Sequence, residues 1–238
     1  MLDGYGPMSV MSNPVLAAPS DIFSKVDPQD LADLLDIGTL RRYEKGQFIF
    51  RAGDPGKNVY FLRTGRVKIY QLSTLGRQVI LWFCFPGEIF GLAEVAHGGG
   101  RVVNAQTCEG ADVLCIAHQR FNAYLETHTA AASVIMQVLS CRLRVLGDML
   151  VNLIDDNVDT RITKLILRLS ACYGTRVGDE VHLNMRMTHQ EIADMVGTTR
   201  QTVTKVLSQL RHGGLLSIEN HRIHIQSREL LSEMSRTA

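Results

Sequence analysis

The stretch MTHQEIADMVGTTRQTVTKVLSQLRHGGLLSIENHRIHI, Met187 to Ile225, decides the fold because it reads as two short helices followed by a hairpin. Thr188 can cap the first helix, and Glu191, three residues later, completes a capping box. Gly197 then interrupts the helical run. A capped helix, a glycine turn and a second helix in this order predict a helix-turn-helix.

The second helix divides into an apolar and a polar face. Either Thr198 or Thr199 can cap it, with Gln201 at capping-box spacing from Thr198. Its apolar side falls at helical spacing on Val203, Val206, Leu207 and Leu210. The residues left pointing outward are Arg200, Gln201, Thr204, Lys205 and Ser208. Such a face suits the DNA major groove, although an ordinary helical hairpin with a solvated face is the plainer interpretation.

Apolar residues alternate on both sides of Glu219-Asn220-His221, at Leu216, Ile218, Ile223 and Ile225. This pattern predicts a two-stranded wing. Residues 160–238 hold 11 Lys and Arg against 7 Asp and Glu, whereas residues 1–159 hold 14 against 17. A basic C-terminal third beside an acidic remainder is a weak mark of nucleic-acid binding. Together these features predict a winged helix-turn-helix.

Length and composition limit the class of protein. The 238 residues suffice for one large or two ordinary domains. No run of about 18 apolar residues is present, so no membrane span is predicted. Residues 1–20 lack the positive start of a secretion signal, and we expect a poorly ordered leader there. The cysteines are odd in number and lack CxxC spacing, which favours reduced thiols and a cytoplasmic protein; they are Cys84, Cys108, Cys115, Cys141 and Cys172.

The N-terminal half is rich in short strands. A helix from Asp21 to about Leu40, capped by Asp27 with Pro28 at its first position, is predicted to precede them. From Tyr43 to about Ala117, glycine-rich turns then separate short apolar or alternating runs. These runs cover residues 47–50, 59–62, 67–71, 78–83, 102–107 and 113–116. Many short strands between regular turns predict an antiparallel β-roll or jelly roll, and the chain as a whole is α+β.

A heptad pattern follows the strands. Its apolar positions, four and three residues apart in alternation, are Ala132, Met136, Leu139, Leu143, Leu146, Leu150 and Leu153. A stripe this narrow favours a long helix that pairs with the same helix of a second copy, and the alternative is packing on its own domain. We expect a hinge at residues 155–158, and a further helix from Arg161 to Cys172 capped by Asn157 or Asp159.

The sequence shows no recognisable catalytic motif of an enzyme. His97 has no nucleophile near it in sequence, and no glycine-rich loop joins a strand to a helix as phosphate-binding folds require. Nothing supplies a nucleophile, a base and an orienting group at a recognisable spacing. We therefore expect no catalytic residues and no metal site, and an enzyme assembled from dispersed residues is the alternative of another class.

Four features together resemble the CRP/FNR superfamily of bacterial transcription regulators. They are the glycine-punctuated roll, the segment PGEIFGLAE (Pro86–Glu94), the long helix and the segment TTRQTVTKVLSQL (Thr198–Leu210). The resemblance runs from about Asp21 to Leu230, and its most specific part is the second helix, which matches the S/T-R-x-T-V recognition pattern. The arrangement it implies is a roll sensor domain at 21–128, a dimerisation helix at 129–156 and a DNA-binding domain at 157–238.

The resemblance also implies DNA contacts. Arg200 matches the arginine that reads guanine, Gln201 stands where many members have a cytosine-contacting glutamate, and Lys205 replaces an arginine. Because Gln prefers adenine, the half-site is expected to differ at that base. The residues expected to contact phosphates are Thr188, Gln190, Thr199 and Thr202. A symmetric homodimer would read an inverted repeat in double-stranded DNA, and in activators the roll also contacts RNA polymerase.

The effector pocket implied by the family would include Gly87, Glu88, Gly91, Leu92 and Arg101. Leu92 replaces the glutamate that holds ribose in cyclic-AMP-binding members, and Glu94 is displaced by two positions. Arg101 survives, but the hydroxyl residue that accompanies it on the cyclic phosphate does not. The helix positions that reach adenine are Leu146 and Gly147. These departures argue against cyclic AMP as the effector.

Members of the family use two cofactors that bear on this chain, an iron–sulfur cluster and haem. Oxygen-sensing members hold an iron–sulfur cluster with several cysteines near the N-terminus, and here the first cysteine is Cys84, so that cluster is not expected. Haem stays open because an axial ligand could come from His97, Cys84, Cys108 or Met149, although Cys84 is expected to be buried and inert. A member without an effector, controlled by its own abundance, and a ligand-binding roll that acts through protein contacts are the remaining alternatives.

Overall fold

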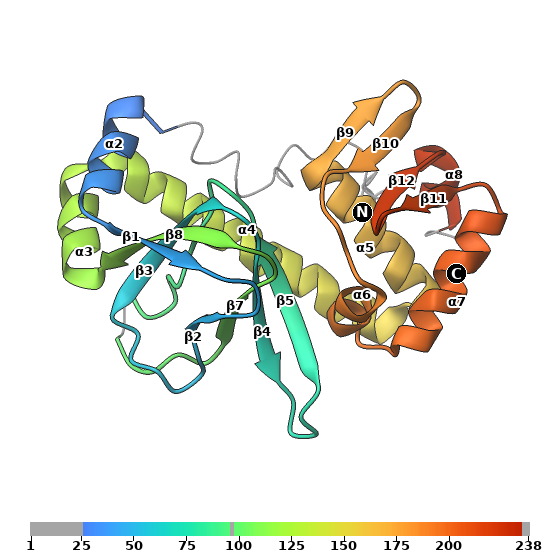
Figure 1. The fold of residues 1–238 in the computed structure, drawn as a ribbon, viewed down its shortest axis with the longest axis horizontal. Helices are drawn as coiled ribbons and strands as arrows, with labels where there is room; N and C mark the ends of the chain where they lie inside the picture. The colour runs from blue at the N-terminus through green and yellow to red at the C-terminus, as the bar shows by residue number, and fades with distance from the viewer. Residues whose placement is uncertain (1–25, 96–97, 235–238) are drawn as a thin grey trace, which may run out of the picture.

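The computed structural model describes residues 26–95 and 98–234 and consists of an N-terminal roll and a smaller C-terminal unit (Figure 1). The helix α4 (Thr129–Asp155) lies behind the roll and leads into the C-terminal unit. The leader predicted at residues 1–20 and the side chain of His97 fall outside the described residues. Within those residues, no helix is both long enough and apolar enough to span a bilayer.

The roll is built from two four-stranded antiparallel sheets, as the strand pattern predicted. The first sheet has the order β1-β8-β3-β6 and the second the order β2-β7-β4-β5. The bounds in the first sheet are β1 Thr39–Tyr43, β8 Ala111–Ala117, β3 Asn58–Thr64 and β6 Ile89–Phe90. Those in the second are β2 Phe48–Phe50, β7 Asn104–Thr107, β4 Val67–Leu72 and β5 Gln78–Cys84.

Aromatic side chains fill much of the space between the two sheets. The rings of Tyr60 and Phe90 stack with centroids 5.3 Å apart, and the Phe50 ring lies 5.4 Å from Tyr60. A second buried cluster lies between the first sheet and the helices, with Leu34, Phe121 and Ile135 among its members. The helices around it are α2 (Pro28–Asp36), α3 (His118–Thr127) and the first half of α4.

The first helix confirms its predicted start but not its predicted end. The carboxylate of Asp27 accepts a hydrogen bond from the Gln29 backbone N–H at 2.8 Å, with Pro28 at the first helical position. The helix was expected to continue to about Leu40, which is wrong, because residues 39–43 form strand β1. The edge of β8 decides this, since β1 pairs along it from Thr39 opposite Cys115 to Tyr43 opposite Ala111.

Helix α4 confirms the long helix and buries only one side of its first half. The buried side consists of Ala131, Val134, Ile135, Val138, Cys141 and Arg142. Five heptad residues are between 44% and 72% exposed, namely Met136, Leu139, Leu143, Leu150 and Leu153. Leu146 is partly buried. The heptad stripe is therefore distinct from the face that covers the roll.

In the described residues, the C-terminal unit is a winged helix-turn-helix built from four helices and a small four-stranded sheet. Helix α5 (Val158–Tyr173) is capped by Asn157, whose side chain accepts from Thr160, so the cap is Asn157 and not Asp159. The remaining elements are β9 Gly174–Val177, β10 Glu180–Leu183, α6 His189–Val196, α7 Arg200–His212, β11 Leu216–Glu219, β12 Arg222–Ile225 and α8 Arg228–Met234. The sheet order is β11-β12-β10-β9.

The sequence pattern found the wing but missed several other elements. The predicted hairpin is β11 and β12, which turn through Asn220 and His221 with φ of 49° and 63°. The missed elements are β1, the two-residue β6, the β9–β10 hairpin and the helices α3 and α8. Strand β1 is largely exposed, and the other missed strands have two to four residues, so none of these strands carries a run long enough for a periodic signal.

We predict that Gly65→Ala destabilises the roll more than Gly76→Ala does. Both glycines have positive φ, 87° and 73°, which costs a side chain about 1–2 kcal/mol. A Cβ at Gly65 would also collide with the Gly110 carbonyl oxygen and with Ala111, whereas Gly76 has nothing within 4 Å of that position. Urea midpoints measured at one protein concentration compare the variants. Equal shifts would show that the close approach at Gly65 is relieved by movement of the neighbouring turn.

Candidate nucleic-acid interface

The first helix of the helix-turn-helix is fixed at its start by a reciprocal cap. The Thr188 hydroxyl accepts from the Glu191 backbone N–H at 3.1 Å, and the Glu191 carboxylate accepts from the Thr188 backbone N–H at 2.8 Å. The helix ends at Gly197, whose φ of 70° places it in the left-handed region. The predicted capping box and glycine turn are both confirmed.

The second helix presents the polar face that the sequence predicted. Thr199, not Thr198, is its cap, because the Thr199 hydroxyl accepts from the Thr202 backbone N–H at 3.2 Å. The apolar side is buried and consists of Val203, Val206, Leu207 and Leu210. The outward side chains of Arg200, Gln201 and Lys205 are exposed near the start of the helix. Side chains at this end of α7 are thus free to reach base edges.

The four candidate phosphate contacts lie at the starts of the two helices. The hydroxyls of Thr199 and Thr202 lie 2.9 Å apart, and the Thr188 hydroxyl is part of the cap of α6. The amide of Gln190 donates to the carboxylate of Asp194 at 2.7 Å. Helix N-termini favour anions, so these positions suit phosphate oxygens, with Gln190 exchanging its internal partner for one.

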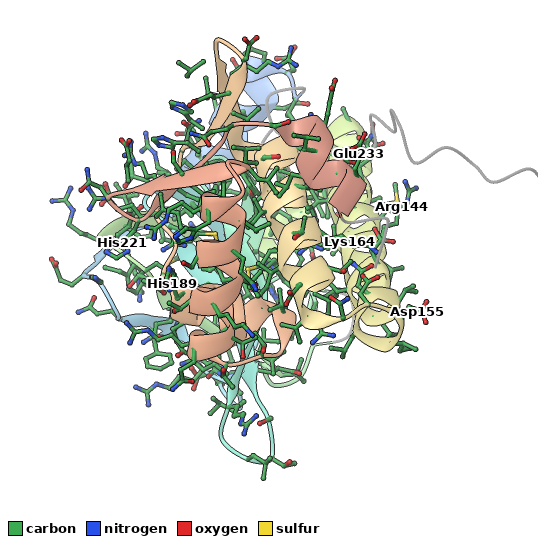
Figure 2. All side chains as sticks on the ribbon, turned by 90° about the vertical axis from the view of Figure 1, so that its right-hand side faces the viewer. Arg144, Asp155, Lys164, His189, His221 and Glu233 are labelled. Atoms are coloured by element: carbon green, nitrogen blue, oxygen red, sulfur yellow. The ribbon has the colours of Figure 1, made fainter. Side chains whose placement is uncertain are left out.

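Two histidines that the sequence reasoning passed over belong to the same surface. His189 lies 2.7 Å from the Thr204 hydroxyl, which joins the first helix to the second. Burial lowers the pKa of His189, and the charges of Arg200 and His221 lower it further. Figure 2 shows His189 and His221 on one side of α7, away from Arg144 and Asp155 of α4. The position of His189, directly after the Thr188 cap, was the available signal.

A buried ion pair joins this unit to the roll. One Arg66 nitrogen lies 2.9 Å from Glu191 Oε1, and the two side chains are 10% and 15% exposed. The Arg66 guanidinium also lies 4.6 Å from the centre of the Phe83 ring, and α6 packs against β5. Because Glu191 Oε2 completes the cap of α6, one carboxylate serves both the cap and the contact with the roll.

The predicted hinge is short and held from the C-terminal side. The side chain of Lys164 lies 2.8 Å from the Asp156 carboxylate. Arg161 donates to the Asp156 carbonyl at 2.8 Å and to the Val196 carbonyl, at the end of α6, at 3.1 Å. Arg161 therefore links the chain directly after α4 to the end of α6, next to the turn of the helix-turn-helix.

In the roll, Arg101 is already occupied by groups of its own chain. It is 3% exposed, forms an ion pair with Glu94, and donates to the carbonyl oxygens of Gly91 and Asn58. Its guanidinium lies 4.3 Å from the centre of the Phe50 ring. The arginine expected to hold an anionic effector therefore has its charge balanced internally, in a space filled by aromatic rings.

The other predicted pocket residues point in different directions. Glu88 is 1% exposed, accepts a hydrogen bond from the Tyr173 hydroxyl at 3.1 Å and has Arg142 at 3.8 Å. It thus lies between the roll, α4 and α5. Leu92 packs into the cluster beneath the helices, and Gly87 forms a turn with φ of 88°. Within the predicted set, the Arg101 guanidinium and the Gly91 carbonyl oxygen are in direct contact.

A cavity of about 300 Å³ opens beside this region in the roll. Its lining residues come from the end of α2, strands β1, β2, β3 and β8, and the start of α3. They include Arg41, Tyr43, Asn58, Tyr60, Cys115 and Arg120. This volume is at the small end of the range for ligand pockets, and its two arginines favour a small anion.

The cysteines named as haem ligands lie in apolar surroundings. Burial raises the pKa of Cys84 to about 12 and that of Cys108 to about 11. Cys84 is fully buried, as the sequence reasoning expected. Since thiolates are the form that ligates metals, these environments disfavour a cysteine ligand.

Comparisons with known proteins agree with this arrangement. Residues 40–128 match the family described as cyclic nucleotide-binding domain, and residues 160–234 match the Crp-like helix-turn-helix domain. The chain is 28% identical over 221 residues to a CRP-like cAMP-activated global transcriptional regulator of Mycobacterium tuberculosis, covering 93% of this chain and 99% of that protein.

A further protein is similar to this chain in sequence, and a solved structure is similar to it in fold. The transcriptional activator protein Anr of Pseudomonas aeruginosa is 29% identical over 199 residues, covering 84% of this chain and 80% of that protein. The structure of FixK2 from Bradyrhizobium japonicum superposes with a TM-score of 0.74 at 24% identity, covering 85% of this chain and 99% of that chain.

We predict that cyclic AMP does not bind this protein, because Arg101 is paired with Glu94 and the Phe50 ring lies against its guanidinium. Calorimetric titration with millimolar cyclic AMP should give no saturable heat, and the melting temperature should not change. The mycobacterial cAMP-activated regulator serves as the positive control. Saturable binding would show that the pair with Glu94 opens for the nucleotide.

Proposed function

This chain belongs to the CRP/FNR superfamily of DNA-binding transcription regulators, and on that premise we propose that it acts as a homodimer on an inverted-repeat site. The observation that carries the proposal is the division of α7 into a buried apolar side and an exposed side with Arg200, Gln201 and Lys205. Its relatives are transcription regulators and not enzymes.

Base recognition is proposed to begin at the start of α7. Arg200 can donate two hydrogen bonds to guanine, and Gln201 can both donate to and accept from adenine. Lys205, one turn further, offers a charge without the planar fork of arginine. Arg200 supplies a positive charge that attracts phosphates, and His189 and the exposed His221 of the wing turn lie on the same side of α7.

Dimerisation is proposed to occur along α4. Exposure of an apolar stripe to water is unfavourable, and a second copy of the helix would bury it. The exposed residues of this stripe are Met136, Leu139, Leu143, Leu150 and Leu153. The stripe reaches Leu153, directly before the hinge, so the pairing of the two helices fixes where the two DNA-binding units begin. In this arrangement RNA polymerase would contact the roll, as in activators of the family.

Control is proposed to come from a small effector or a redox or gas signal in the roll. The cavity is lined by Arg41 and Arg120, whose positive charges suit a small anion. Arg120 belongs to α3, which packs on α4, so an anion bound there would act on α4. The signal would then reach the helix-turn-helix by two routes, through the hinge with Arg161 and through the pair of Arg66 with Glu191. Control by abundance alone is the alternative if nothing binds.

We predict that Arg200→Ala weakens binding to the specific site by about 1–3 kcal/mol and relaxes preference at one base pair, because a bidentate contact to guanine is lost. Binding to a set of site variants at fixed salt measures this. Arg176→Ala, which removes an equal charge from strand β9 at the far edge of the sheet, is the matched control. An equal loss on every sequence would assign Arg200 to phosphate instead.

We predict that Leu143→Asp separates the subunits and abolishes specific DNA binding, because a charge is placed in the proposed apolar contact. Leu143 is 72% exposed in the single chain, so the change should not unfold the protomer. Sedimentation velocity and operator binding measure the two effects, with Gln137→Asp on another exposed part of α4 as the control. A Leu143→Asp dimer that still binds its site would refute this interface.

A further inference from the structure

The outer face of the C-terminal sheet gathers two histidines and a glutamate. On strand β10, Val181 and Leu183 point into the core, so Glu180 and His182 point to the opposite face. On β12, Ile223 and Ile225 are buried and His224 takes the outer face. Register then places His182 directly opposite His224. Strand alternation and the register of β10 with β12 together bring the three side chains to one surface.

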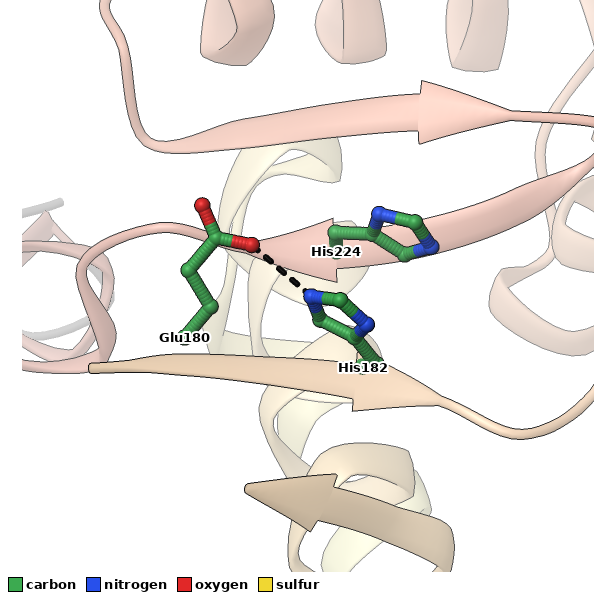
Figure 3. Close-up of side chains that lie close together, drawn as sticks. All are labelled: Glu180, His182 and His224. Atoms are coloured by element: carbon green, nitrogen blue, oxygen red, sulfur yellow. Dashed lines mark hydrogen bonds and ion pairs between the residues drawn. The ribbon is translucent and has the colours of Figure 1, made fainter. Parts of the chain in front are cut away.

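Their ligating atoms are already close (Figure 3). His182 Nε2 lies 2.8 Å from Glu180 Oε2. The imidazole rings of His182 and His224 are nearly parallel, with centroids 3.9 Å apart and an angle of 9° between their planes. One nitrogen or oxygen atom from each residue lies within 4.8 Å of the other two. All three side chains are partly buried, so each keeps one side open to solvent.

We propose that Glu180, His182 and His224 form a binding site for a divalent transition metal, with Zn²⁺ as the ion that suits it best. Two imidazoles and one carboxylate are donors that Zn²⁺ favours, and hard ions such as Mg²⁺ prefer oxygen ligands alone. Zn–N and Zn–O bonds of about 2.0–2.2 Å place the ligand atoms of a tetrahedral site roughly 3.3 Å apart. Small rotations of three side chains reach that spacing, and a water molecule would complete the shell.

The surroundings of the site keep the ligands in place and leave the ion room. On the neighbouring strands, Thr175 of β9 lies opposite His182 and Ser217 of β11 lies opposite His224; both are small hydroxyl residues. Arg222 shares the outer face with His224 and lies opposite Glu219 in the β11–β12 register. The strands are hydrogen-bonded on both sides of the site, so the backbone need not move.

A bound ion would be coordinated by residues of both β10 and β12, and would link these strands more strongly than their backbone hydrogen bonds do alone. Strand β12 begins at the wing turn, where the His221 carbonyl accepts from the Met187 backbone N–H at 2.9 Å, just before α6. Metal binding would therefore fix the wing relative to the helix-turn-helix. The site does not depend on the DNA-binding proposal, because its ligands are distinct from the residues assigned to DNA.

The test is a titration of the metal-free full-length protein with Co²⁺, followed by displacement with Zn²⁺. We expect one equivalent of Co²⁺ to give visible d–d bands without the near-ultraviolet charge-transfer band of a thiolate ligand. We also expect Zn²⁺ to remove those bands and to raise the melting temperature. His182→Ala, His224→Ala and Glu180→Gln should each weaken binding by more than about 10-fold, the lower range for loss of an outer-shell partner.

His212→Ala is the matched control, since His212 is an exposed histidine at the end of α7, bonded to the Ser208 carbonyl. It should bind Co²⁺ as the unaltered protein does. Circular dichroism checks that each variant is folded. Absence of stoichiometric binding by the unaltered protein would overturn the proposal. So would bands that persist in a folded His182→Ala, His224→Ala double variant, because the ion would then lie elsewhere.

Discussion

Helix α4 carries two separate apolar faces, and the rest of the molecule is arranged around this helix. Its 27 residues extend roughly 40 Å, from the roll to the first helix of the C-terminal unit. The side carrying Val134, Ile135 and Val138 is covered by the roll, while the heptad stripe stays exposed. Because both faces belong to one helix, the packing of the roll on α4 and the proposed pairing of two α4 helices would depend on each other.

Glu191 likewise serves two parts of the structure at once. Its two carboxylate oxygens hold the start of α6 and the guanidinium of Arg66. Tyr70, Ile80 and Phe83 of the roll belong to the same buried cluster as the core of the helix-turn-helix, so the two halves share apolar surface beside the ion pair. A small shift of the roll would thus act on the N-terminus of α6, and Arg161 would carry movement of the hinge to its C-terminus.

In the interior of the roll, the charge of Arg101 is balanced by the protein itself. Arg101 is retained, but Glu94 neutralises it and the Phe50 and Tyr60 rings lie over it. An anion entering there would have to displace an ion pair that is already desolvated. The open space lies instead beside Arg41 and Arg120, where the chain has a polar cavity.

The sequence by itself determined the α+β architecture, the roll of short strands, the long helix, the Thr188 capping box and the polar face of α7. These follow from local periodicity, caps and turns, which are properties of neighbouring residues. Tertiary structure alone decided that residues 39–43 are a strand, because the edge of β8 supplies their hydrogen bonds. It also decided that Arg101 faces Glu94, that Glu88 meets Tyr173, and that His182 lies opposite His224. Each of these depends on pairing between segments distant in sequence or on burial of a charge, and no local pattern encodes which partner will be present.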